Sequence, residues 1–146
     1  MTSQGSTSVP RILVVDDQPD IRLMCRVNLQ LEGYEVLEAA DGEAGLEMVK
    51  NEHPDLVLLD VMMPGLDGWQ FMEVIKADEK TAQIPIVLLT ARVQREDEIR
   101  GWLSGAADYL PKPFNPSTLT DVVRRTLMNL GNDDRRQRAL DKLSII

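Results

Sequence analysis

Short apolar runs alternate with longer amphipathic segments along most of this chain. The apolar runs lie at Ile12 to Val15, Tyr34 to Ala39, Leu56 to Leu59, Ile86 to Leu89 and Ala107 to Leu110. Three of the runs are unbroken and rich in valine, isoleucine and leucine, which is typical of strands buried on both faces of a parallel sheet. The segments between the runs have the apolar spacing of helices, so the pattern predicts five consecutive strand–helix units.

Residues that start and stop helices occur at suitable places between these runs. Pro19 and Pro116 each lie near the start of a helical segment, where the missing N–H of proline costs nothing. Asp41 is a suitable N-cap for the segment that runs to Asn51, and Gly33 follows the first helix as a stop signal. This alternation predicts an α/β fold, a doubly wound parallel sheet with helices on both faces.

One domain accounts for nearly the whole chain in this interpretation. Residues 1–9 are expected to be a flexible leader, and residues 10–130 form the domain. Residues 131–146 form a polar break and then a short charged segment with Leu140, Leu143 and Ile146 along one edge. This segment is either an extension of the last helix or a frayed terminus, or it is a helical tail or linker that leads to an output domain or docks on the main domain.

Composition narrows the class of protein further. The 146 residues include 24 acidic and 16 basic side chains, and the formal charge of −8 makes the domain a poor ligand for nucleic acid or anionic lipid. The longest apolar runs have four or five residues, far fewer than the roughly 20 needed to span a bilayer, and the N-terminus lacks a secretory signal. We therefore expect a soluble, cytoplasmic protein that binds neither nucleic acid nor membrane through this domain.

Polar residues follow four of the five predicted strands. Asp16 and Asp17 follow the first, Asp60 the third, Thr90 the fourth and, after a proline, Lys112 the fifth. A lone aspartate after a strand is usually a turn residue or a helix cap. In an open α/β sheet, however, ligands bind beyond the carboxyl ends of the strands. The joint pattern therefore predicts a site that combines three carboxylates, a hydroxyl and an ammonium group.

This set of groups is suited to phosphoryl chemistry. Three converging carboxylates repel one another unless a cation is present, and Mg²⁺ characteristically binds one or two carboxylates together with waters and a phosphate. Lys112 supplies a point charge for one phosphoryl oxygen, and Thr90 a hydroxyl donor for another. A carboxylate beside Mg²⁺ can itself attack phosphorus and form an aspartyl-phosphate.

Four motifs then make a family resemblance specific: Val15-Asp16-Asp17, the stretch from Leu59 to Gly68, Leu89-Thr90-Ala91, and the stretch from Asp108 to Phe114. In these motifs, and in order over roughly residues 11–130, the sequence resembles the receiver domain of two-component response regulators. The resemblance implies a flavodoxin-like doubly wound (βα)5 fold with a five-stranded parallel sheet in the order 2-1-3-4-5.

The resemblance also assigns roles to individual residues. It implies that Asp60 is the phosphoacceptor and that Asp17, Asp60 and the backbone carbonyl of Met62 bind Mg²⁺, or Mn²⁺ in its place. Asp16 would hold the metal through water. Two glycines in the loop after Asp60, Gly65 and Gly68, suit a turn that needs positive φ.

The remaining roles concern the phosphoryl group and the signal. The resemblance implies that Lys112 contacts the phosphoryl group and that its peptide bond to Pro113 is cis. Thr90 and Tyr109 would form the switch pair. The phosphoryl donor would be a sensor histidine kinase or a histidine phosphotransfer protein, and the signal would pass to a downstream output domain or protein. A homodimer that forms on phosphorylation is compatible with this pattern, and the receiver is either free-standing or part of a larger response regulator.

Two other classes of protein fit the sequence less well. A haloacid-dehalogenase-type phosphatase needs a second acid two residues after its nucleophile, where this chain has Met62. A flavodoxin-like carrier of flavin mononucleotide needs a Ser/Thr/Gly-rich loop after the first strand, where this chain has two aspartates, Asp16 and Asp17. We therefore expect a domain that catalyses its own phosphorylation and autodephosphorylation, without turnover on a separate substrate.

Four further residues have a structural interpretation. Cys25 lies among apolar residues of a helical segment and is expected to pack there. His53 precedes a proline and is expected in a surface turn. Trp69 is expected to pack against the core, and Trp102 either packs in the same way or forms part of a partner surface.

Overall fold

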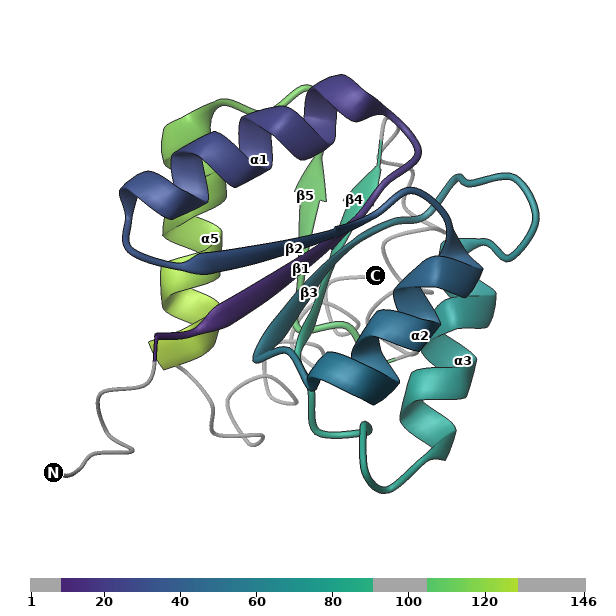
Figure 1. The fold of residues 1–146 in the computed structure, drawn as a ribbon. Helices are drawn as coiled ribbons and strands as arrows, with labels where there is room; N and C mark the ends of the chain where they lie inside the picture. Colours follow the sequence, from purple (N-terminus) through teal and green to yellow (C-terminus); the bar gives the residue numbers. More distant parts are fainter. Residues whose placement is uncertain (1–8, 91–104, 129–146) are drawn as a thin grey trace, which may run out of the picture.

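Five strands and four helices make up the part of the chain that the computed structural model describes, which is residues 9–90 and 105–128 (Figure 1). In chain order they are β1 (Arg11–Val15), α1 (Pro19–Leu31), β2 (Glu35–Ala39), α2 (Gly42–Glu52), β3 (Leu56–Asp60), α3 (Gly68–Ala77), β4 (Ile86–Thr90), β5 (Asp108–Pro111) and α5 (Pro116–Met128).

All five strands are parallel and lie in the order β2-β1-β3-β4-β5, so the predicted fold is confirmed. Every residue of β3 and β4 is buried, as their unbroken apolar sequences predicted. β2 begins at Glu35, one residue later than the apolar run, because the N–H of Tyr34 still donates to the Leu29 carbonyl at the end of α1. β5 likewise begins at Asp108 rather than Ala107.

Two helical layers enclose the sheet, with α1 and α5 on one face and α2 and α3 on the other (Figure 1). β1 shows how the sequence divides between them. Leu13 and Val15 pack in the core cluster on the side of α2 and α3, and Ile12 and Val14 pack in the cluster on the side of α1 and α5. Successive strand residues point to opposite faces, so a continuous apolar run fills both cores at once.

The helix boundaries follow the predicted signals closely. Pro19 occupies the first turn of α1, and the Asp41 carboxylate accepts a hydrogen bond from the Ala44 N–H at 2.7 Å at the start of α2. Gly33 ends the first helix with φ of +94°. α2 runs one residue beyond the predicted Asn51, to Glu52, and its C-cap His53 is exposed and has φ of +48°.

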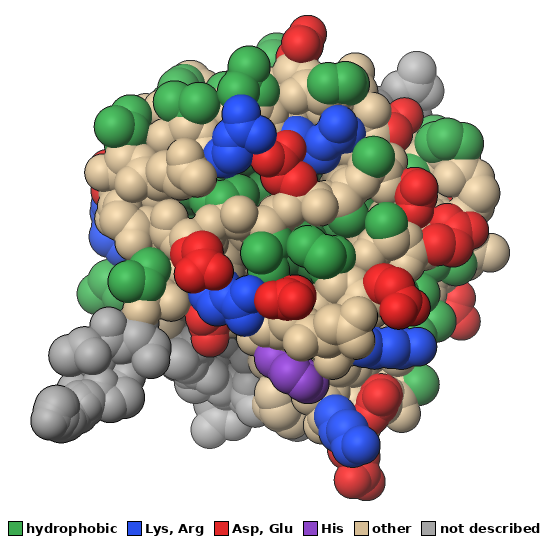
Figure 2. All heavy atoms as spheres, in the orientation of Figure 1, with side chains coloured by type: hydrophobic (Ala, Val, Ile, Leu, Met, Phe, Trp, Pro, Cys, Tyr) green, Lys and Arg blue, Asp and Glu red, His purple; other side chains and the backbone are tan. Residues whose placement is uncertain are grey.

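α1 buries only one of its faces. Its residues Cys25 and Leu29 are fully buried, which confirms the packed position expected for the thiol, and burial raises the pKa of Cys25 to about 12. Leu23, Val27 and Leu31 are exposed on its outer side, and hydrophobic side chains are visible over α1 in Figure 2. The neutral, buried thiol has the character of a packing residue rather than a reactive one.

Several expectations fall outside the described residues. These are nearly all of the leader at residues 1–9, the tail at residues 131–146, Trp102, and the helix expected between β4 and β5. The domain boundaries therefore stay predictions. Within residues 9–90 and 105–128, none of the helices has both the length and the apolar character that a membrane crossing requires.

Candidate functional site

The carboxyl ends of the strands meet at one edge of the sheet, and the predicted polar residues lie there. Asp60 and Thr90 are the last residues of β3 and β4, and Asp16 and Lys112 directly follow β1 and β5. The peptide bond between Lys112 and Pro113 is cis, as expected. Because all strands are parallel, these ends must point the same way, and the fold brings together residues that are nearly one hundred positions apart.

Three carboxylates form the centre of this edge. Asp16, Asp17 and Asp60 each place a carboxylate oxygen within 4.8 Å of the others. The cluster is buried on one side and open on the other, since Asp16 is 0% exposed, Asp60 is 3% exposed, and Asp17 is exposed to solvent. A small ligand from solution can therefore reach carboxylates that are themselves largely desolvated.

Among the described residues, Lys112 is the cation that faces these carboxylates. Its Nζ lies 2.7 Å from Asp16 Oδ2 and 3.5 Å from Asp60 Oδ2. It also donates to Gln18 Oε1 at 3.0 Å. The Lys112 side chain is only 9% exposed, so its charge acts in surroundings of lowered dielectric. One ammonium group thus partly neutralises the two buried carboxylates, Asp16 and Asp60.

The surroundings of Asp60 disfavour its ionised form. Burial raises its pKa to about 6, and the charge of Asp16 adds to this effect. Lys112 and the N–H of Met62, which donates to Asp60 Oδ1 at 3.0 Å, lower the pKa but do not restore its ordinary value. A carboxylate with these neighbours gains from a further cation, which is a property of ligand sites.

The loop after Asp60 is shaped by two glycines for different reasons. Gly65 has φ of +76°, as predicted for this turn. Gly68 does not have positive φ, so that part of the prediction was wrong. Its requirement is space, since a Cβ at Gly68 would lie 2.7 Å from the carbonyl oxygen of Asp60. α3 can therefore start directly against the end of β3.

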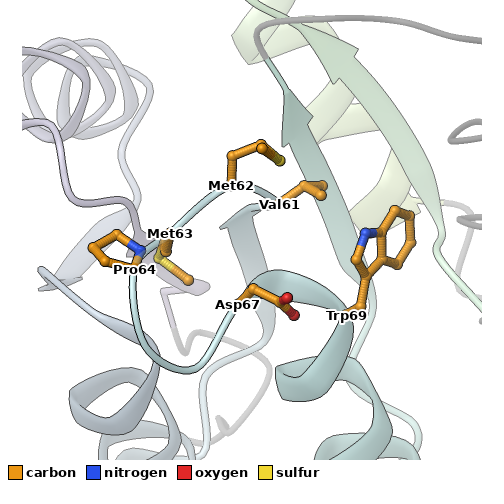
Figure 3. A pocket seen from close by; sticks show the side chains of 6 residues that line it. All are labelled: Val61, Met62, Met63, Pro64, Asp67 and Trp69. Carbon is orange, nitrogen blue, oxygen red and sulfur yellow. The ribbon is translucent and has the colours of Figure 1, made fainter.

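A pocket of about 320 Å³ lies along this loop, and it is lined by Val61, Met62, Met63, Pro64, Asp67 and Trp69 (Figure 3). Trp69 is 9% exposed and packs in the core, as predicted, whereas the Met62 side chain is 73% exposed. The Asp67 carboxylate accepts a hydrogen bond from the Gln70 N–H at 3.0 Å and so caps α3. This pocket was not predictable from the sequence, because only the packing of the loop encloses the space.

Thr90 and Tyr109 lie on the same face of the sheet. Tyr109 is the register partner of Leu88, and Thr90 is two residues beyond Leu88 on the same strand. Thr90 is 3% exposed, and the Tyr109 ring packs against the core cluster on the side of α2 and α3. The pair thus joins the acidic site to the interior along one face of β4 and β5.

Gln18 is a site residue that was not among those predicted from the sequence. It is the N-cap residue of α1, and its side chain accepts from Lys112. Its position directly after the two aspartates was a usable signal, but the contact itself joins residues 94 positions apart.

Comparisons with known proteins agree with this geometry. The family model of the response regulator receiver domain matches residues 12–124. The chain is 43% identical over 119 residues to the DNA-binding dual master transcriptional regulator RpaA of Synechocystis. The matched region covers 82% of this chain and 49% of RpaA. It is 40% identical over 121 residues to the phosphate regulon transcriptional regulatory protein PhoB of Escherichia coli, covering 83% of this chain and 53% of PhoB. The chain thus spans about half the length of these curated relatives.

Solved structures show the same likeness. The chemotaxis response regulator CheY4 of Vibrio cholerae matches with a TM-score of 0.78 and 35% identity, over 82% of this chain and 99% of that one. A response regulator structure from Chloroflexus aurantiacus matches with a TM-score of 0.79 and 35% identity, over 84% of this chain and 100% of that one.

Proposed function

This chain belongs to the response regulator receiver domain family, and from that membership we propose that it is a phosphorylation switch whose phosphoacceptor is Asp60. Receiver domains are signalling domains rather than enzymes that turn over a separate substrate. The observation that carries the proposal is the position of the Asp60 carboxylate. It ends a buried central strand, lies 3.5 Å from Lys112, and has the Asp16 and Asp17 carboxylates beside it.

The proposed reaction needs little covalent chemistry from the protein. An oxygen of ionised Asp60 attacks the phosphorus atom of the donor and forms an acyl phosphate, while the bond from phosphorus to the donor breaks and its electron pair leaves with the donor. Hydrolysis later breaks the new bond, regenerating the carboxylate and releasing inorganic phosphate. Positioning and charge neutralisation account for most of the catalysis of such transfers.

The acidic cluster fits a hard divalent cation. Its three oxygens lie close together, and burial together with the charge of Asp16 raises the pKa of Asp60, so a further positive charge would favour the ionised form of Asp60. We infer that Asp17, Asp60 and the backbone carbonyl of Met62 hold Mg²⁺ or Mn²⁺ directly, and that Asp16 holds it through water. When bound, the cation supplies charge neutralisation for the carboxylates and the phosphoryl oxygens.

Lys112 and the switch pair have separate proposed tasks. Lys112 already divides its charge between Asp16 and Asp60, so a short movement of its ammonium group lets it contact a phosphoryl oxygen. The Thr90 hydroxyl donates to another phosphoryl oxygen. Movement of Thr90 changes the space available to Tyr109 on the same face of the sheet, and this carries the signal outward.

Partners are proposed from the family and from the relatives. The donor is a sensor histidine kinase or a histidine phosphotransfer protein. Two relatives of about twice the matched length are named as transcriptional regulators, and one of them as DNA-binding. We propose that this receiver controls an output of the same kind, as part of a longer protein or through a separate one, and that a phosphorylation-dependent homodimer is one form of that control.

Phosphorylation by a small donor tests the proposal directly. With Mg²⁺ and acetyl phosphate, the wild-type protein should gain one phosphoryl group, about 80 Da, that is lost at alkaline pH as expected of an acyl phosphate. Asp60→Asn should gain none. Asp67→Asn is the matched control, because Asp67 lies in the same loop, serves as a helix cap and can be replaced by another good cap. Normal labelling of Asp60→Asn would contradict the assignment.

A further inference from the structure

Arg22 connects the acidic site to two other elements of the fold. Its Nη1 donates to the backbone carbonyl of Asp16 at 2.7 Å, and its Nε lies 3.4 Å from Glu38 Oε1 on β2. The Arg22 side chain is 19% exposed, so both contacts are largely sheltered from water. The guanidinium group therefore spans from β2 to the first residue of the acidic pair.

A neighbouring arginine indicates that the contacts of Arg22 do more than connect α1 to β2. Arg26, one turn further along α1, pairs with Glu38 Oε2 at 2.6 Å and thus already joins the two elements. Arg22 is the fourth residue of α1, close to the helix N-terminus, where the helix dipole disfavours a cation. Its placement there is compensated by the Glu38 carboxylate and by the Asp16 carbonyl oxygen.

The carbonyl that Arg22 holds belongs to the peptide unit between Asp16 and Asp17. A peptide unit is planar, so fixing its oxygen also fixes the direction in which the chain leaves toward Asp17. The N–H of Asp16 donates to the Ala39 carbonyl at 3.1 Å, which anchors the residue from the other side. Asp16 is therefore held by its own N–H and C=O, and Asp17 inherits its orientation from Asp16.

We propose that Arg22 is a positioning residue of the cation site, which orients the Asp16–Asp17 peptide so that both carboxylates face the bound cation. The inference rests on the proposed function and adds a residue that contacts neither the cation nor the phosphoryl group. Groups that orient metal ligands commonly change metal affinity by about 10-fold or more when they are removed.

Charge and position predict opposite results, which makes the test sharp. Arg22 is a cation near the site, so its removal would strengthen Mg²⁺ binding if it acted only through charge. If Arg22 acts by positioning, Arg22→Met should weaken Mg²⁺ binding by about 10-fold. Arg22→Lys keeps the charge but cannot span both acceptors with a planar fork, so it should bind Mg²⁺ about 3-fold or more weakly than the wild type.

Arg26→Met is the matched control, since Arg26 shares Glu38 but its hydrogen bond does not reach the acidic pair. It should leave Mg²⁺ affinity within about 2-fold of the wild type, by the usual size of exposed ion-pair effects. Affinities can be read from NMR titration, or from tryptophan fluorescence if Trp69 responds to the bound cation. In the metal-free protein, Arg22→Met and Arg22→Lys should also change the amide signal and hydrogen exchange of Asp17, whereas Arg26→Met should not.

The outcomes separate the inference from the function on which it rests. Equal or tighter Mg²⁺ binding in both Arg22 variants, with an unchanged Asp17 amide, would overturn the positioning role while the wild type still binds Mg²⁺ and is phosphorylated. A wild-type protein that binds no Mg²⁺ would overturn the proposed function and this inference together. If Arg22→Met is not folded, Arg22→Lys and the metal-free amide signals still decide the matter.

Discussion

The two ends of the sheet use the same kinds of charged residues with opposite results. At the amino end, Arg11 pairs with Glu35 at 3.1 Å and with Glu52 at 2.6 Å, and its backbone N–H donates to Asp55 Oδ2 at 2.7 Å. These side chains are 29–54% exposed at both ion pairs. At the carboxyl end, Asp16 and Asp60 are buried and both form ion pairs with Lys112. The carboxylate of Asp17 lies beside theirs.

The pKa shifts express this difference. Arg11 has its pKa raised by its hydrogen bonds to Glu52 and Glu35, so its charged form is favoured where it stands. Asp60 has its pKa raised to about 6 by burial and by Asp16, so its charged form is disfavoured. The paired charges at the amino end hold strands and helix together. The partly buried carboxylates at the carboxyl end, in contrast, can gain stability from a bound cation.

The largest effect on stability should come from removing a buried negative charge at the carboxyl end of the sheet. We expect Asp60→Asn to raise the free energy of unfolding of the metal-free protein at pH 7 by about 2 kcal/mol, because a charge that is costly to bury is removed. Urea unfolding in a chelating buffer measures this. An Asp60→Asn variant less stable than the wild type at pH 7 would contradict the unsatisfied charge at this end.

The difference in stability between Asp60→Asn and the wild type should also depend on pH. The pKa of Asp60 is raised from 3.8 to about 6 on folding, so the folded state holds its proton more tightly than the unfolded state does. The stability advantage of protonated Asp60 is present at pH values below about 4 and is lost as the pH rises through 6. The difference in stability between Asp60→Asn and the wild type should therefore grow over that range and be constant above it.

A smaller effect is expected at the exposed carboxylate of the cluster. Asp17→Asn should weaken Mg²⁺ binding by about 10-fold, equivalent to about 1.4 kcal/mol, because a charged ligand is lost from a site with few ligands. Lys112→Ala should leave Mg²⁺ affinity similar or higher, since a competing cation is removed, and yet impair phosphorylation. NMR titration, or tryptophan fluorescence if Trp69 responds to the cation, measures the Mg²⁺ affinity of both variants. An unchanged affinity in Asp17→Asn would contradict its assignment as a ligand.

The smallest effect should appear at the amino end. Arg11→Met removes two exposed ion pairs and should lower the free energy of unfolding by about 1 kcal/mol or less, with Mg²⁺ affinity unchanged. Raising the salt concentration should shrink this difference, because exposed charges are screened. Urea unfolding at low and high salt, together with a Mg²⁺ titration, checks it. A large loss of Mg²⁺ affinity in Arg11→Met would mean that the two ends of the sheet are coupled.

Much of the carboxyl-end site was predictable because its residues are placed by strand polarity. The apolar runs marked the strands, and strand–helix alternation made them parallel, so the residues after them had to lie at one edge. The motifs around Asp60 and Lys112 then pointed to the family before any contact was known. Gly68 was interpreted wrongly because its need for space arises from the carbonyl of Asp60, which only the packed structure places against it.

The order of the elements, the polar residues at the strand ends and the family could all be inferred from the linear pattern of residues, since all three depend on local periodicity and on motifs. Folding in three dimensions buries Asp16 but leaves Asp17 exposed, raises the pKa of Asp60, and brings Gln18 to Lys112 and Arg22 to Asp16. Burial and electrostatics depend on every element packed around a group. A linear pattern names the groups, but only packing sets their distances and their access to water.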